Sequence, residues 1–225
     1  MNNSPEKTLT QKDIEEELKA AAREKREANF KSRTIQEVNL SERTIDVGIN
    51  FQEATILGLA YLNKTSVGGD LNFEGATINN SLYLGEGTIK GNLNCGGILV
   101  GEVLNLIGIT VEKNINLEGA IIKGFLSLNK ASIKGNVNSK KIVIQDSKAS
   151  TGIIKGDAHF QEIKVEEFVD LEEAYIDGLM DFQKAEIKGF LNLKNTDIGD
   201  FLILKDAVVE GELRLTGLRC KGEIS

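Results

Sequence analysis

The sequence of 225 residues is poor in several residue types that other classes of protein depend on. It contains one proline, no tryptophan, one histidine and two cysteines, and aromatic residues make up only 5% of it. Cys95 and Cys220 fit neither a disulfide framework nor a metal-ligand spacing, so we expect reduced thiols in a cytoplasmic protein. The sequence also lacks the roughly 20 consecutive apolar residues of a membrane helix. Its polar, acidic N-terminus does not resemble a targeting peptide.

Motifs of catalysis are missing as well. No second histidine, nucleophile motif or phosphate-binding glycine loop accompanies His159, the single histidine. We therefore expect no enzyme, with no catalytic residue, no cofactor and no metal. The net charge of −7 argues against direct binding to a nucleic-acid backbone.

What the sequence has in abundance is an eleven-residue repeat. From Ala54 onward, blocks such as ATILGLAYLNK, TSVGGDLNFEG and AEIKGFLNLKN align on the consensus A-x-I-x-G-x-L-x-L-x-x. The third position is Ile or Val in fifteen of sixteen blocks, and the fifth is glycine in ten. Such regularity is the signature of a solenoid, in which each repeat packs on its neighbours.

The pattern within one block predicts two short strands. Alternation places the Ala, Ile and Leu positions on one side and polar residues on the other, and glycine in most blocks excludes a long helix. Eleven residues enclose too little space for four inward side chains, so two blocks should form one coil. Parallel crossovers are right-handed. The sequence thus predicts an all-β fold over residues 32–225: a right-handed parallel β-helix of about 22 residues per coil and roughly eight coils, with glycine corners where φ is positive.

Two resemblances follow from these blocks. A small inward residue followed by an apolar one, with sides of five or six residues, resembles the quadrilateral β-helix of pentapeptide-repeat proteins from Arg43 to Ser225. That resemblance implies a protein-binding module, including an acidic rod that mimics DNA and occupies a DNA-binding enzyme. The recurring I-K-G-x-L-N-L is similar to bactofilins, which are polymer-forming cytoskeletal β-helices. Neither resemblance implies a catalytic residue.

The two ends of the predicted solenoid differ. We expect residues 1–10 to be disordered and residues 11–31 to form a helix that begins with a capping box of Thr10 and Asp13. This helix either caps the first coil or mediates oligomerisation. The last block stops partway, which predicts an exposed strand edge suited to self-association. The candidate residues there are Leu213, Leu215, Leu218, Cys220 and Ile224.

Three further features concern the surface. The ten-residue block IVIQDSKAST predicts a register slip at 145–151 that divides the rod into two halves. The eighth position points outward and predicts one column of axially hydrogen-bonded amides, from Asn50, Asn72, Asn94, Asn116 and Asn138. The acidic excess lies after residue 151 and predicts either a solvated face or a partner face, formed by Glu162, Glu166, Glu167, Asp170, Glu172, Glu173, Asp177 and Asp181.

The function that the sequence favours is a non-enzymatic cytoplasmic scaffold. It would self-associate through exposed terminal coils as a dimer or a filament, without a membrane span and without direct nucleic-acid binding. The alternative is a protein-binding module of the pentapeptide-repeat type, in which the acidic half mimics DNA.

Overall fold

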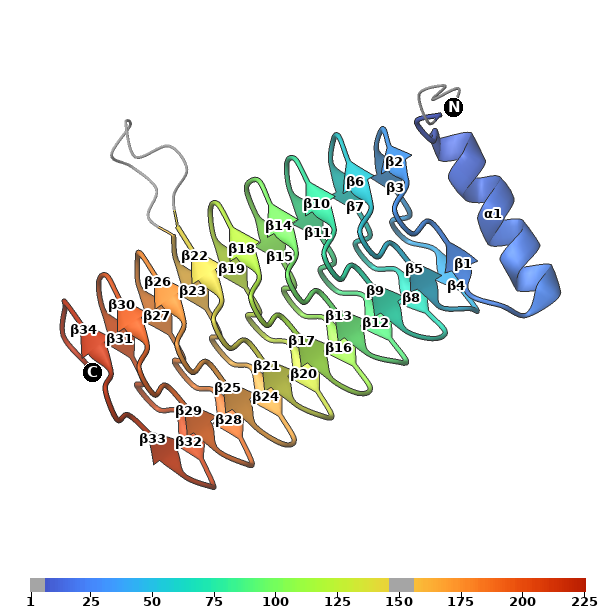
Figure 1. Cartoon of the computed structure of the whole chain (residues 1–225). Coiled ribbons are helices and arrows are strands. Elements are labelled where there is room, and N and C mark those ends of the chain that lie inside the picture. The colour runs from blue at the N-terminus through green and yellow to red at the C-terminus, as the bar shows by residue number, and fades with distance from the viewer. Residues whose placement is uncertain (1–6, 146–155) are drawn as a thin grey trace.

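The protein is a parallel β-solenoid, described here from a computed structural model of residues 7–145 and 156–225 (Figure 1). The described residues contain one helix, α1 (Gln11–Glu24), and 34 strands of two residues each. The strands form four parallel sheets, and each strand pairs with the strand four places further along the chain. Paired residues are 22 apart in most pairs, such as Leu71 and Leu93. The prediction of two blocks per coil and about eight coils is confirmed.

The first sheet contains β1 (Ala28–Asn29), β5 (Ile49–Asn50), β9 (Leu71–Asn72), β13 (Leu93–Asn94), β17 (Ile115–Asn116), β21 (Val137–Asn138), β25 (Val169–Asp170), β29 (Leu191–Asn192) and β33 (Leu213–Arg214). The second contains β2 (Thr34–Ile35), β6 (Thr55–Ile56), β10 (Thr77–Ile78), β14 (Leu99–Val100), β18 (Ile121–Ile122), β22 (Val143–Ile144), β26 (Tyr175–Ile176), β30 (Asp197–Ile198) and β34 (Arg219–Cys220). The third contains β3 (Val38–Asn39), β7 (Ala60–Tyr61), β11 (Leu82–Tyr83), β15 (Leu104–Asn105), β19 (Leu126–Ser127), β23 (Ala158–His159), β27 (Met180–Asp181) and β31 (Leu202–Ile203). The fourth contains β4 (Thr44–Ile45), β8 (Ser66–Val67), β12 (Thr88–Ile89), β16 (Thr110–Val111), β20 (Ser132–Ile133), β24 (Lys164–Val165), β28 (Glu186–Ile187) and β32 (Val208–Val209).

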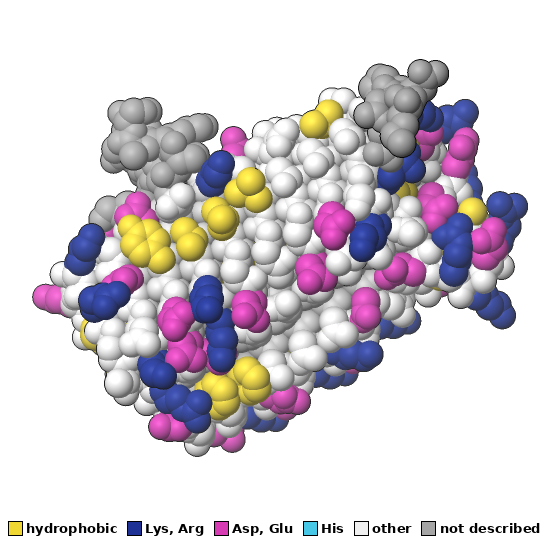
Figure 2. All heavy atoms as spheres, in the orientation of Figure 1, with side chains coloured by type: hydrophobic (Ala, Val, Ile, Leu, Met, Phe, Trp, Pro, Cys, Tyr) yellow, Lys and Arg dark blue, Asp and Glu magenta, His cyan; other side chains and the backbone are white. Residues whose placement is uncertain are grey.

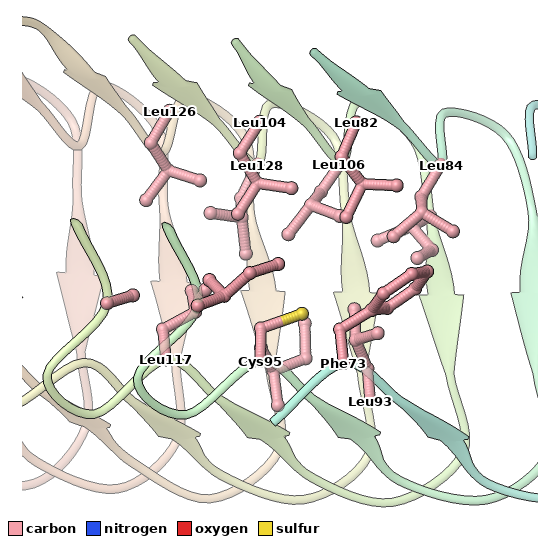
Figure 3. Packing of buried hydrophobic residues seen from close by; sticks show 14 of the residues in the cluster. Phe73, Leu82, Leu84, Leu93, Cys95, Leu104, Leu106, Leu117, Leu126 and Leu128 are labelled. Atoms are coloured by element: carbon pink, nitrogen blue, oxygen red, sulfur yellow. The ribbon is translucent and has the colours of Figure 1, made fainter. Parts of the chain in front are cut away.

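The interior is filled by columns of apolar side chains, one from each coil (Figure 3). Leu82, Leu104 and Leu126 follow one another in the third sheet. Phe30, Phe51 and Phe73 stack with ring centroids 5.0 and 4.9 Å apart. All of these side chains are buried, so stacking of coils supplies the apolar burial that a single block lacks.

Cys95 is a member of this core and not a reactive group. Figure 3 shows its side chain among Phe73, Leu93 and Leu117. Burial raises the pKa of the Cys95 thiol to about 12, which keeps it protonated and inert. Both cysteines are free, as the sequence predicts.

The fifth-position glycines serve a purpose other than the predicted one. Apart from Lys25 after α1, the positive φ angles in the described ranges occur at the last position of a block, where residues such as Lys64 and Lys130 also occur. The fifth position instead lies against the previous coil. A Cβ on Gly124 would stand 2.4 Å from the carbonyl oxygen of Glu102, and one on Gly189 equally close to that of Glu167. Glycine there permits close stacking of the backbones.

Two departures from the 22-residue period are absorbed without breaking the sheets. The first coil is one residue short, since Thr34 pairs with Thr55. The predicted slip at 145–151 lies mostly outside the described residues, and its flanks show an insertion: Val143 pairs with Tyr175, 32 residues away. All four sheets continue past this point, so the rod is not divided into two halves.

The N-terminal segment also differs from its prediction. The helix α1 ends at Glu24 and not at residue 31, because Lys25 turns the chain at φ 53° and the following residues pair as β1. The capping box of Thr10 and Asp13 is present. Residues 7–10 are ordered, although disorder is expected over 1–10: Leu9 is buried and forms a bridge with Ile35.

The close stacking at the fifth position generates a testable prediction. Gly124→Ala should lower the free energy of unfolding by about 1–3 kcal/mol, because its Cβ overlaps the Glu102 carbonyl and the backbones must separate. Lys130→Gly is the matched control in the same block, since its φ of 59° suits glycine and should leave stability unchanged or raised. Urea unfolding followed by circular dichroism measures both. Equal stability of Gly124→Ala and wild type would contradict the steric argument.

Candidate functional site

The first coil of the solenoid is covered by the N-terminal segment. The buried side chains of Ile14, Leu18 and Ala21 turn α1 toward it. Its strand edges also receive hydrogen bonds. The backbone N–H of Asn29 in β1 donates to Glu17 Oε1 at 2.9 Å. The backbone of Leu9 forms hydrogen bonds along the edge of β2.

The edge of β3 is covered by the side chain of Gln11, which hydrogen-bonds the backbone of β3 as a neighbouring strand would. Asn39 N donates to Gln11 Oε1 at 3.0 Å, and Gln11 Nε2 donates to Asn39 O at 2.8 Å. An ion pair of 2.8 Å between Glu15 and Arg43 ties α1 to the residue before β4. At this end, edge backbone groups of β1, β2 and β3 therefore have hydrogen-bond partners within the chain.

The last coil is arranged differently, because its inward positions are open to solvent. The fractional exposures of Leu213, Leu215 and Ile224 are 41%, 37% and 54%, whereas Leu218 and Cys220 are partly buried against the core. All five residues that the sequence nominates for self-association belong to this coil: Leu213 lies in β33, Cys220 lies in β34, and Ile224 bridges to Leu202 of β31.

The eight acidic residues nominated as a partner face do not share a face. Glu166 belongs to the fourth sheet side, Asp170 to the first sheet and Asp181 to the third. Four of the eight have lysine neighbours one coil away: Glu166 with Lys188, Asp170 with Lys140, Glu172 with Lys194 and Glu173 with Lys141. Lys194 lowers the pKa of the Glu172 carboxyl. Figure 2 accordingly shows acidic and basic side chains interspersed over the visible surface.

The predicted asparagine column follows the outer side of the first sheet. Along the axis, Asn116 Nδ2 donates to Asn94 Oδ1 at 3.0 Å and Asn138 Nδ2 donates to Asn116 Oδ1 at 3.3 Å. Each Oδ1 also accepts the backbone N–H two residues later, as Asn72 does from Glu74 at 2.9 Å. These side chains therefore cap the turn that follows each strand.

A second amide column, which the sequence analysis missed, lies beside the first. It is formed at the sixth position by Asp70, Asn92, Asn114 and Asn136. Each side-chain oxygen accepts the backbone N–H one coil further on; Asn114 Oδ1 accepts from Asn136 N at 2.9 Å. The sequence does contain a sign of this column, since a polar residue recurs every 22 residues at the sixth position of alternate blocks.

The two amide columns border hollows on the surface. One has a volume of about 370 Å³ and is lined by Glu27, Asn50, Asp70, Asn72, Asn92, Leu93, Asn94, Asn114 and Asn116. The next has about 440 Å³ and is lined by Asn114, Ile115, Asn116, Glu118, Asn136, Asn138, Lys140, Phe168 and Asp170. They share Asn114 and Asn116 and lie next to each other along the first sheet; together they are here called the amide groove.

The single histidine has neighbours that the sequence analysis also missed. Ser127, His159 and Asp181 occupy one outward column of the third sheet in successive coils. The ten-residue insertion hid the alignment of Ser127. Within the described residues, Asp181 accepts hydrogen bonds from Gln161 and Gln183 instead of His159, and the His159 ring meets Phe125 edge-on at 6.2 Å. The three residue types of a Ser-His-Asp catalytic triad thus follow one another along this column, but the hydrogen bonds of a triad do not join them.

Over residues 7–145 and 156–225, no three His, Cys, Asp or Glu side chains are placed to hold a metal ion, and no helix is long and apolar enough to cross a membrane. No protein-family model, curated protein or solved structure matches the chain. The similarity to pentapeptide-repeat proteins thus rests on the parallel β-solenoid itself.

The covered first coil should respond to acid. The Arg26 guanidinium, followed by the Asn29 amide, holds the pKa of Glu17 below its usual range, against the opposing effect of burial. A lowered folded-state pKa contributes stability above the ordinary carboxyl pKa of about 4.3, which is lost as the pH falls through the folded-state value. We expect the hydrogen-exchange protection factor of the Asn29 amide to fall between pH 6 and pH 3.

Glu17→Gln separates this carboxylate from Glu15 and Asp13, whose pKa values are lowered in the same segment. The variant should show lower Asn29 protection at pH 6 and a smaller decrease on acidification. An unchanged decrease would show that Glu17 does not hold the edge of β1.

Proposed function

We propose that this chain is a non-enzymatic, cytoplasmic scaffold that self-associates through the last coil of its solenoid. The observation that carries the proposal is the difference between the ends. Backbone and side-chain groups bind the edges of β1, β2 and β3 in the first coil, whereas Leu213, Leu215 and Ile224 are exposed at the other end. Burial of such side chains contributes roughly 1.5–3 kcal/mol each.

The covered first coil favours one mode of assembly. A filament needs two complementary ends on each molecule, whereas an isologous contact uses the same surface twice and closes as a dimer. With α1 across the first coil, the last coil of a second copy is the matching surface. We therefore expect a closed dimer in place of the open polymer that bactofilins form.

The alternative of an acidic DNA mimic finds no specific support in the arrangement of charge. A mimic presents an uninterrupted row of negative groups, and here lysines alternate with the carboxylates from coil to coil.

Light scattering over a concentration series tests the dimer. Leu213→Asp combined with Ile224→Asp should convert a dimer to a monomer, because two carboxylates would have to lose their hydration in the contact. Leu57→Asp is the matched control, since Leu57 is equally exposed, at 39%, on the side of the rod. A wild-type protein that stays monomeric at all concentrations, or a double variant that still dimerises, would contradict the proposal.

A further inference from the structure

The amide groove begins at Glu27, beside the first coil, and does not reach the last coil, so it has no role in the proposed assembly. We propose that it binds a linear, uncharged polysaccharide aligned with the axis of the solenoid. The groove follows the first sheet from Asn50 in β5 to Asp170 in β25. Five steps of about 4.8 Å give it a length of about 24 Å.

The groove presents hydrogen-bonding groups at a regular spacing. Within the described residues, the Nδ2 atoms of Asn50, Asn72 and Asn136 donate no hydrogen bond, although their Oδ1 atoms accept one each from the backbone. These three side chains are half-buried, so the donors face the groove without being sealed from solvent. An amide both donates and accepts, as a hydroxyl group does. A chain with hydroxyls along its length can therefore meet one amide in every coil.

The charge of the groove selects against polyanions. Its lining holds four carboxylates, from Glu27, Asp70, Glu118 and Asp170, and one ammonium group, that of Lys140. Lys140 lies 3.2 Å from Asp170 and is neutralised by it. Nucleic acids and acidic polysaccharides need an excess of positive charge, so neither is expected to bind here.

The shape of the groove disfavours an extended peptide. A peptide gains most of its affinity by adding a strand to an open sheet edge and by placing alternate side chains in apolar pockets. This groove lies over the outer face of a sheet whose backbone is already paired. Its apolar lining consists of Leu93 and Ile115, which are fully buried, and Phe168 at one end.

Titration of the full chain with soluble hexasaccharides tests the proposal. The probes are cellohexaose, xylohexaose and maltohexaose, with hexagalacturonate as the charged comparison, and nitrogen-15 NMR of the asparagine side-chain amides reports the site. At least one neutral probe should bind saturably and shift the signals of the groove asparagines. Absence of binding by all three, preference for hexagalacturonate, or shifts confined to other residues would overturn the proposal.

Asn→Asp substitutions separate recognition from folding, because aspartate keeps the oxygen that caps the turn and loses the amide donor. The groove already contains Asp70 and Asp170 in equivalent positions. Asn72→Asp combined with Asn136→Asp should weaken binding at least tenfold. Asn105→Asp is the matched control: its Oδ1 caps Ile107 N at 2.9 Å in the third sheet, outside the groove. An equal loss in the control would show a structural effect and overturn the assignment.

Discussion

The parallel pairing of each coil with the next is the constraint on which the whole structure depends. Adjacent strands are held about 4.8 Å apart by backbone hydrogen bonds, so a residue is forced against the residue one coil before it. Stacked rings such as Phe51 on Phe73 satisfy this spacing. It also demands glycine at Gly124, where the Glu102 carbonyl leaves no room for a Cβ. A residue type whose side chain can stack on an identical side chain at this distance therefore recurs in successive coils and forms a column.

The inward pattern repeats every eleven residues and therefore cannot by itself distinguish the two blocks of a coil. The outward pattern can, because its period is 22. Asparagine occupies five successive strands of the first sheet, from β5 to β21, whereas β7 and β11 of the third sheet carry Tyr61 and Tyr83 at the equivalent position, with rings stacked 5.4 Å apart. Opposite charges recur in the same way on the fourth sheet side, where Glu112 meets Lys134. Exposed ion pairs add little stability, so we expect their main contribution to be that they favour the correct register between adjacent coils.

Most of the architecture could be predicted because every repeat shows the same alternation of apolar and polar positions, so the pattern is seen many times in one sequence. The coil length, the four-sided solenoid and the amide column follow from period and polarity. The predictions that were wrong or missing concern features that occur once in the chain and are not repeated from block to block. The helix stops at Lys25 because the next residues pair with a strand 21 residues away. The neighbours of His159 depend on an insertion of ten residues. The acidic residues lie close together in the sequence, but the structure distributes them over different sheets because the chain turns around the coil between them.

The same geometry separates the two surfaces to which functions are assigned. An end of the solenoid is a single surface: Leu213 and Ile224 are exposed there, so the proposed contact would use that end once per molecule. A side of the solenoid is periodic: each coil adds one equivalent amide rung, so affinity for a repeating ligand grows with the number of coils engaged. We therefore expect a substitution at the end to alter the proposed assembly and to leave the side-chain amides intact. We expect loss of one amide to weaken the proposed groove without disturbing the end. The two proposed activities would then vary independently, although one hydrogen-bonded stack supports both surfaces.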